Sequence, residues 1–305
     1  INSIKDWNIA EEDKKDMLKY IQDLRLGKIT KKPVQDNTLD GYIAHLKRFL
    51  EFFRKVSTKL IEKDIDNFCD SLLKDKMTYS FRKKDVDGKT QTQNRPYSES
   101  HKTKLKNSAI LYLKWKLGNK ASKIIKSLEV KTPLKQKTPD FLNGDEVDKL
   151  FRACKTPEQR FFLAVLFDSG ARAQEFYNIR KSDIEIPRGS GEEFVKLTLR
   201  EEFSKTKGRT ISLYWKRSLD AVQDFMIQRI SEGVDSEDPI FTKPYKSMKT
   251  WLNRLGQRVL GRSIHFHLFR NSSATFYCTN LNRQELCYRY GWRFSSPMPD
   301  RYINR

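Results

Sequence analysis

The residues of this sequence that are best suited to chemistry are arginines, and their spacing fits work on a phosphate. Glu175 follows Arg172 by three positions, which places the two side chains on one face of a helix. Arg270 follows His267 by the same interval. Guanidinium groups bind phosphate oxygens through paired hydrogen bonds. We therefore expect a site that neutralises a phosphodiester with arginines and attacks it with a side chain.

No metal-binding pattern accompanies these arginines. The HExxH motif and the P-loop are both absent from the sequence. A nuclease or transposase that uses two metal ions needs clustered carboxylates, and acidic residues near the arginines are few. The cysteines lack CxxC spacing and fit buried apolar positions of a reduced protein: Cys69, Cys154, Cys278 and Cys287. We expect no metal and no other cofactor.

The charge of the chain indicates a polyanionic partner. Lysine and arginine number 60 against 39 acidic residues, a formal net charge of +21. Residues 1–136 carry 31 basic and 18 acidic side chains, and residues 137–305 carry 29 and 21, so both halves are basic. This distribution favours nucleic acid over a generic solubility charge. Double-stranded DNA is the expected partner.

Membrane insertion and export are not expected. The longest apolar run, residues 161–167, is far shorter than a membrane span. No signal peptide opens the chain, which begins at Ile1. We expect a cytoplasmic, nucleoid-associated protein of prokaryotic, archaeal or viral origin.

The first half of the chain predicts a small helical bundle. Apolar residues recur every three or four positions at residues 10–24, 38–55, 62–75 and 100–117. Thr38 is the expected N-cap of the second helix. The polar, turn-rich segment 78–98 predicts a mobile loop. The last helix offers five lysines as DNA contacts, with a solvated helix face as the competing interpretation: Lys102, Lys104, Lys106, Lys114 and Lys116.

The second half predicts helices around one small sheet. A linker at 131–139 has a composition suited to facing phosphates, with Lys131, Lys135 and Lys137 as DNA contacts. Asn143 is the expected cap of the next helix, and Gly170 the end of a buried one. Alternating residues predict strands at 194–200 and 209–215, and helical spacing recurs near 217–230, 246–260, 267–279 and 284–290. The expected fold is mainly α with a small antiparallel sheet, in domains 1–130 and 140–305.

Four segments resemble, in order, the motifs of the tyrosine recombinases, the phage-type integrases that act as site-specific recombinases. They read SGARAQEFYNIRKSDIE (169–185), SKTKGRTISL (204–213), HLFRNSSATF (267–276) and RYGWRFSSPMPDRYINR (289–305). Each is weak alone, whereas the full series in this order is a strong signal. With the preceding bundle and linker, the resemblance covers nearly the whole chain and implies a helical, SAM-like core-binding domain and a catalytic domain that clamp duplex DNA.

The resemblance implies a role for each motif residue. Tyr302 would be the nucleophile, and its attack builds negative charge that Arg172 and Arg270 would hold. Glu175 would orient the fork of Arg172. His267 would be the general base, with His265 as a competitor.

The remaining motif positions would complete the site. Lys205 would protonate the leaving 5′ oxygen, with Lys207 as the alternative. Trp292 would bond a phosphate oxygen and shield the site. Two features depart from the family's common pattern. Asn271 stands where a second histidine is frequent, and ten positions separate Trp292 from Tyr302.

The implied function is site-specific DNA recombination through a 3′-phosphotyrosyl intermediate, by a tetramer assembled on DNA. Integration, excision and dimer resolution all fit. One alternative is relaxation of DNA in the manner of a type IB topoisomerase, which sequence-specific cleavage would separate. Another is a catalytically silent DNA-binding module of the same fold, against which the full residue set argues. Segment 293–305 has two prolines and little apolar content, which predicts mobility without DNA.

Overall fold

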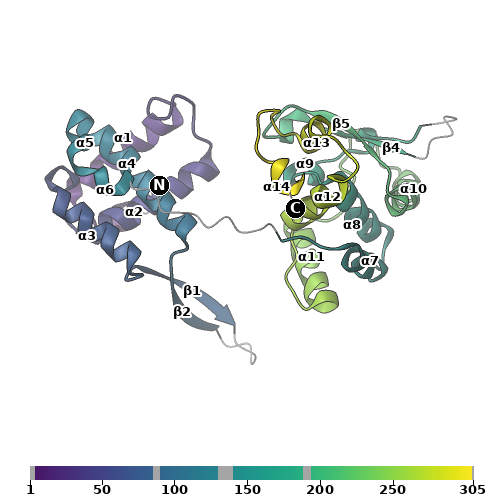
Figure 1. Ribbon diagram of the computed structural model, residues 1–305, viewed down its shortest axis with the longest axis horizontal. Coiled ribbons are helices and arrows are strands. Elements are labelled where there is room, and N and C mark those ends of the chain that lie inside the picture. Colours follow the sequence, from purple (N-terminus) through teal and green to yellow (C-terminus); the bar gives the residue numbers. More distant parts are fainter. Residues whose placement is uncertain (1–3, 85–89, 130–139, 188–193, 304–305) are drawn as a thin grey trace. The chain divides into compact units, whose positions relative to one another are not determined.

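Two units make up the chain in the computed structural model, Ile1–Gln136 and Lys137–Arg305 (Figure 1). The structure describes residues 4–84, 90–129, 140–187 and 194–303. The predicted linker 131–139, with Lys131, Lys135 and Lys137, lies outside these residues. In the described part of the chain, no helix combines the length and apolar character needed to cross a bilayer.

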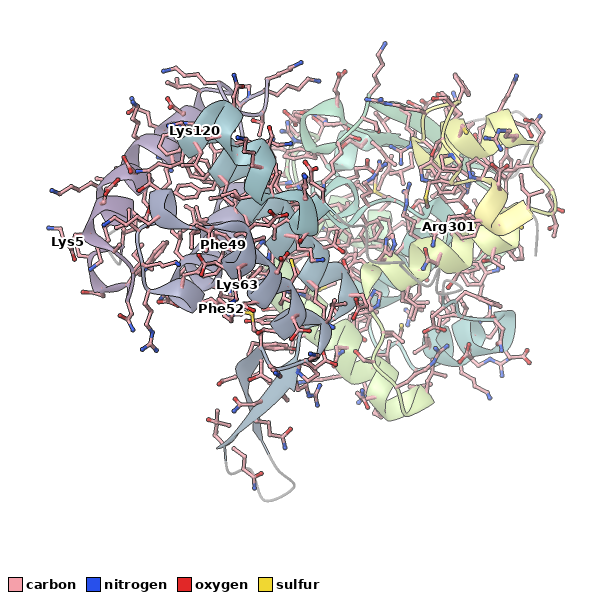
Figure 2. All side chains as sticks on the ribbon, turned by 60° about the vertical axis from the view of Figure 1, so that its left-hand side comes forward. Lys5, Phe49, Phe52, Lys63, Lys120 and Arg301 are labelled. Carbon is pink, nitrogen blue, oxygen red and sulfur yellow. The ribbon has the colours of Figure 1, made fainter. Side chains whose placement is uncertain are left out.

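The N-terminal unit is a bundle of helices with one two-stranded ribbon. Its elements are α1 (Glu11–Arg25), α2 (Asp36–Phe53), α3 (Glu62–Leu73), β1 (Thr78–Lys84), β2 (Thr90–Pro96), α4 (Glu99–Leu117), α5 (Ala121–Ile124) and α6 (Lys126–Glu129). The predicted helices are therefore present. Thr38 is not the N-cap of α2, because the helix begins at Asp36 after Gln35. Figure 2 shows Phe49 inside the unit and Lys5 at its surface.

The prediction of a loop over 78–98 is wrong. The two strands pair antiparallel from Thr78↔Pro96 to Lys84↔Thr90. Polar residues throughout β2 gave no apolar alternation from which a strand could be inferred, yet backbone pairing does not depend on apolar side chains.

A buried carboxylate fixes the bundle's centre. Asp13 of α1 is fully buried and accepts hydrogen bonds from the backbone N–H of Ser57 (2.9 Å), from the Ser57 hydroxyl and from the Tyr112 hydroxyl (2.9 Å). These contacts replace the water that the carboxylate loses on burial. The helix α4 is thereby held against α1.

The C-terminal unit packs helices around α8 and beside a three-stranded antiparallel sheet of order β3-β4-β5. Its elements are α7 (Gly144–Arg152), α8 (Pro157–Ser169), α9 (Ala173–Tyr177), β3 (Ile184–Glu185), β4 (Val195–Leu199), β5 (Arg209–Leu213), α10 (Lys216–Ser231), α11 (Tyr245–Leu260), α12 (Phe266–Tyr277), α13 (Arg283–Tyr290) and α14 (Asp300–Ile303).

The structure of this unit confirms several predictions made from short stretches of sequence. Asn143 caps α7, since its side chain accepts from the N–H of Glu146 at 2.9 Å. The strands β4 and β5 appear where alternation predicted them, and Val195, Leu197 and Leu199 all face the core. The prediction of a mainly helical fold with a small antiparallel sheet is confirmed.

Candidate active site

The turn before Arg172 needs a glycine. Gly170 ends α8 with φ of +56°, and a Cβ there would lie 2.4 Å from Cε1 of Tyr290 and 2.8 Å from Oγ of Ser273. The chain then enters α9, whose N-cap is Arg172. A residue with a side chain at position 170 would push this turn away from α12 and α13.

Arg172 and Glu175 are in contact through two bonds. The backbone N–H of Arg172 donates to Oε2 of Glu175 (2.9 Å), and its Nη1 donates to Oε1 (2.8 Å). Nη1 also lies 3.4 Å from Oγ1 of Thr206, the neighbour of Lys205. The first and second sequence motifs therefore meet, whereas the orienting role of Glu175 stays a prediction.

A second arginine, which the sequence interpretation missed, shares the same carboxylate. Arg209 of β5 is buried and donates to Glu175 through Nη2 (3.0 Å) and Nη1 (3.3 Å). The sequence did contain a signal for this arginine. Side chains alternate between the two faces of a strand, so Arg209 shares the inward face of β5 with Ile211 and Leu213. An arginine on such a face needs a buried anion.

The charge state of Glu175 follows from these contacts. Burial alone would raise the pKa of its carboxyl. Hydrogen bonds and the positive charge of Arg209, with further bonds from the Ser204 hydroxyl and the Arg172 N–H, outweigh that effect and lower the pKa to about 2. Glu175 is therefore ionised and able to hold both arginines.

The C-terminal end of α13 gathers three arginines. The carbonyl of Arg289 accepts from Nε of Arg209 (2.8 Å), that of Tyr290 from Nη2 of Arg270, and that of Gly291 from Nη2 of Arg172 (3.1 Å). The last carbonyls of a helix lack partners within the helix and carry partial negative charge. Guanidinium groups from three distant segments satisfy them and are thereby brought together.

Gly291 permits this convergence. Its φ is +57°, and a Cβ there would lie 2.9 Å from Nη1 of Arg209 and 2.9 Å from Oγ1 of Thr206. Both the left-handed backbone and the close approach require glycine at this position.

Arg270 projects from α12 into the same region and is buried. Its Nη1 donates to the carbonyl of Gly170 (2.8 Å), and its guanidinium lies 5.6 Å from the ring centroid of Trp292. Burial, followed by the positive charge of Arg172, lowers the pKa of Arg270. Two like charges held so close favour an anion between them.

The two histidines occupy different positions. His265 is the N-cap of α12, where Nδ1 accepts from the N–H of Leu268 at 3.2 Å. His267 has no such capping role. Desolvation, then the positive charges of Arg270, His265, Arg301 and Arg172, lower the pKa of His267. Its imidazole lies within the field of the arginines and favours the neutral form that a base requires.

Both candidate lysines line one cavity of about 620 Å³ between the β4–β5 connection and α13. Lys205 and Lys207 are exposed, and Trp292 borders the same cavity. The geometry brings the hairpin lysines to the arginine cluster and leaves the choice between them open.

Tyr302 lies buried against Trp292, although the composition of segment 293–305 predicted mobility. Its ring stacks on that of Trp292 at 5.6 Å, and its hydroxyl donates to Oδ1 of Asn271 at 2.9 Å. The segment is also attached by an ion pair between Arg283 and Asp300. Apolar content was low along the segment, but one aromatic contact and a few polar ones suffice to dock it through residue 303.

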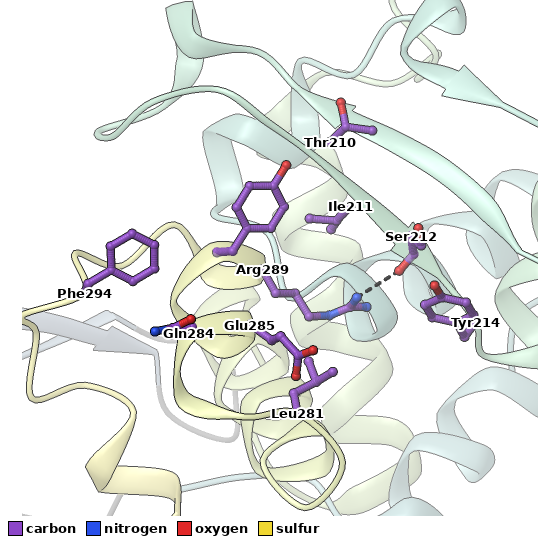
Figure 3. Close-up of a pocket in the computed structure, with 10 residues that line it drawn as sticks. Thr210, Ile211, Ser212, Tyr214, Leu281, Gln284, Glu285, Arg289 and Phe294 are labelled. Carbon is purple, nitrogen blue, oxygen red and sulfur yellow. Dashed lines mark hydrogen bonds between the residues drawn. The ribbon is translucent and has the colours of Figure 1, made fainter.

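A second, shallower cavity of about 430 Å³ lies between β5 and α13 (Figure 3). Arg289 borders it and donates to the carbonyl of Ser212 (2.8 Å) and to Oδ1 of Asp168 (2.9 Å). Asp168 is fully buried in α8. This ion pair ties α13 to α8 and fixes the helix end that receives the arginines.

The lysines of α4 differ in their surroundings. Lys104 is exposed, whereas Lys102 and Lys106 are buried. Lys102 pairs with Asp75 (2.8 Å) and Glu99 (2.7 Å). Of the other two, Lys114 lies 3.1 Å from Glu129, and Lys116 contacts Glu12 and Asp16. DNA contact by this set stays a prediction, with Lys104 the most available member.

Comparison with known proteins identifies the family. A model described as the phage integrase family matches residues 140–304. The tyrosine recombinase XerA of Saccharolobus solfataricus is 22% identical over 251 residues, covering 79% of this chain and 72% of that protein. A tyrosine recombinase of Thermosipho africanus is 27% identical over 254 residues, covering 79% and 78%.

Solved structures of lambda integrase share the fold. A dimer bound to a COC′ core site matches with a TM-score of 0.61 at 12% identity, covering 93% of this chain and 76% of that one. A tetramer bound to a Holliday junction matches with a TM-score of 0.58 at 14% identity, over the same shares.

Proposed function

The chain belongs to the phage integrase family and is a tyrosine-type site-specific recombinase, and we propose that it cuts and rejoins DNA through a 3′-phosphotyrosyl bond at Tyr302. The observation that carries the proposal is the convergence of Arg172, Arg209 and Arg270 on the end of α13, one residue before Trp292 and its stacked partner Tyr302. A phosphodiester is the anion that such a cluster suits.

Arg172 and Arg270 hold the phosphate in this mechanism. Attack by the phenol builds charge on the non-bridging oxygens, and fixed guanidinium groups stabilise that charge without reorganising. Glu175 and Arg209 are positioning residues, because Glu175 contacts Arg172, Arg209 contacts the end of α13, and both are buried. Trp292 covers the site and supplies an indole N–H.

Two proton transfers complete each cleavage. An ordinary phenol has a pKa of about 10, so Tyr302 must lose its proton as it attacks, and His267 receives it. Lys205 gives a proton to the leaving 5′ oxygen. Asn271, which accepts from the Tyr302 hydroxyl, holds the phenol until DNA is bound.

Rejoining reverses these steps. A 5′-hydroxyl from a partner duplex attacks the phosphotyrosine and gives its proton to Lys205, while His267 returns its proton to the departing Tyr302 oxygen. The phosphotyrosine retains the energy of the broken phosphodiester, so the proposed cycle consumes no nucleotide.

Strand exchange between two sites needs several protomers. Lambda integrase, which shares this fold, forms a tetramer on a Holliday junction. We assign the same assembly to this chain, with residues 1–130 as a helical core-binding domain and 140–305 as the catalytic domain of a clamp on duplex DNA. Lys104 and Lys114, the exposed lysines of α4, serve as contacts to the DNA backbone.

The test is a covalent adduct. Wild-type protein mixed with a pool of nicked duplexes of random sequence should accumulate DNA-linked protein that survives denaturant, and its digest should contain the peptide around Tyr302. Tyr302→Phe should form none. Tyr214→Phe is the matched control, because Tyr214 is an exposed tyrosine that lines the neighbouring cavity of Figure 3 but not the cavity of the two lysines. Equal adduct yield from Tyr302→Phe would refute the nucleophile.

A further inference from the structure

The β1–β2 ribbon is a two-stranded element with little to pack against. Seven residue pairs join its strands, and no third strand pairs with them in the part of the chain that the structure describes. Every residue of β2 is exposed. Figure 1 shows the ribbon extending from the helices of its own unit. A lone hairpin gains little stability in water, so its retention suggests a surface that it meets.

The root of the ribbon is firmly held. Tyr79 of β1 stacks on Tyr97 (5.4 Å), and Tyr97 stacks on His101 of α4 (4.8 Å). The guanidinium of Arg48, from α2, lies 6.0 Å from the Tyr97 ring centroid. The ribbon therefore leaves the bundle in a direction fixed by aromatic contacts.

The two faces of the ribbon carry different side chains. The register places Phe81, Gln93 and Arg95 on one face. The guanidinium of Arg95 lies over the ring of Phe81, with Cζ 4.2 Å from the ring centroid, which restrains its fork. The opposite face carries Thr92 and Asn94.

The ribbon sequence has a positive net charge. Residues 78–96 contain five basic residues and two acidic ones, Asp85 and Asp87, and Arg95 of β2 is exposed. Near the root, burial is the main cause that lowers the pKa of His101, and the positive charges of Arg48 and Lys104 add to it. A polyanion is the partner that complements such a surface.

We propose that the β1–β2 ribbon is a DNA-reading arm that lies in the major groove, where Gln93 and Arg95 contact base edges. The groove is about 12 Å wide and admits a two-stranded ribbon. A glutamine amide can pair with adenine and an arginine fork with guanine, both through major-groove atoms. This inference rests on the proposed action on DNA, and adds a sequence-reading element outside the catalytic unit.

The experiment compares two double variants of unchanged net charge. Gln93→Ala with Arg95→Lys removes the amide and the fork from one face, and Thr92→Ala with Asn94→Ala changes the other face to a similar degree. Each protein selects sequences from a pool of random duplexes. Binding to the duplex preferred by wild type is then measured at several salt concentrations, with thermal unfolding as the check of folding.

We expect the Gln93/Arg95 variant to lose base preference at positions that wild type and the control share. Its affinity for the preferred duplex should fall at least about 10-fold, with an unchanged salt slope. Replacing guanine by 7-deazaguanine at the affected positions removes N7, and should weaken wild type but not this variant. Identical preferences and affinities in all three proteins would overturn the inference, as would loss of self-assembly with base preference intact.

The same proteins and the preferred duplex also test the proposed function independently of the ribbon. Adduct formation by wild type on the preferred duplex supports cleavage at Tyr302 whatever the ribbon does. Its absence counts against the phosphotyrosyl mechanism, while a dependence of base preference on Gln93 and Arg95 would still stand.

Discussion

Glu175 links a single ionisation to the stability of the C-terminal unit. Its pKa is lowered to about 2 in the folded chain, so its contribution is complete above its ordinary value near 4.5 and is lost as pH falls from there to 2. A shift of this size corresponds to about 3 kcal/mol. Glu175→Gln should therefore reduce the free energy of unfolding at pH 7, and the difference from wild type should shrink toward pH 2.

Urea unfolding at several pH values measures that difference. Glu201→Gln is the control, because Glu201 is exposed and should change the curve little. A gap between wild type and Glu175→Gln that is the same at pH 7 and pH 2.5 would contradict the assigned ionisation.

Lys205 is tested by the leaving group. Lys205→Ala should slow cleavage by roughly 10²- to 10⁴-fold, the usual effect of a positioned proton donor. A substrate with sulfur at the 5′ leaving position needs little protonation, and should restore the rate of this variant selectively. Lys207→Ala is the matched control from the same cavity. Rescue of Lys207→Ala in place of Lys205→Ala would move the acid role to Lys207.

At the scale of elements, the end of α13 is the part on which the arginines depend. Gly291 and Gly261 both end helices with positive φ, but only Gly291 is crowded, by Arg209 and Thr206. Arg209 cannot move aside easily, because it is buried and bonded to Glu175. Gly261→Ala should cost about 1 to 2 kcal/mol of stability, the left-handed strain alone, and leave cleavage intact.

Gly291→Ala should cost more and abolish most cleavage, because the inserted methyl displaces Arg209 from the Arg289 carbonyl. Thermal unfolding and single-turnover adduct formation report the two effects. Comparable losses of cleavage in both glycine variants would show that the crowding at Gly291 does not govern the site.

At the scale of the whole molecule, the docked position of Tyr302 bears on how protomers share a site. The nucleophile stacks on Trp292 and bonds Asn271 of its own chain. We therefore expect delivery within each protomer, so a mixture of Tyr302→Phe and Arg172→Ala proteins should stay inactive. Gel electrophoresis of adducts, with assembly on DNA verified by sedimentation, checks this. Cleavage restored in the mixture would establish exchange between protomers.

The sequence alone determined the family and most of the elements. Helical spacing placed α2 and α4, alternation placed β4 and β5, and Asn143 marked the start of α7, because these signals act between residues a few positions apart. Arginine and tyrosine motifs in a fixed order indicated a tyrosine recombinase, and the family match bears this out.

Only the tertiary structure decided how these residues are held. Arg209 meets Glu175 across 34 positions, and Arg172 meets the Gly291 carbonyl across 119. No local pattern encodes such pairings, since they depend on where whole elements pack. Tyr302 is docked by a stacking contact that the polar composition of its segment concealed. The ribbon over 78–96 was missed for a related reason: backbone hydrogen bonds between its strands, rather than apolar side chains facing a core, hold it together.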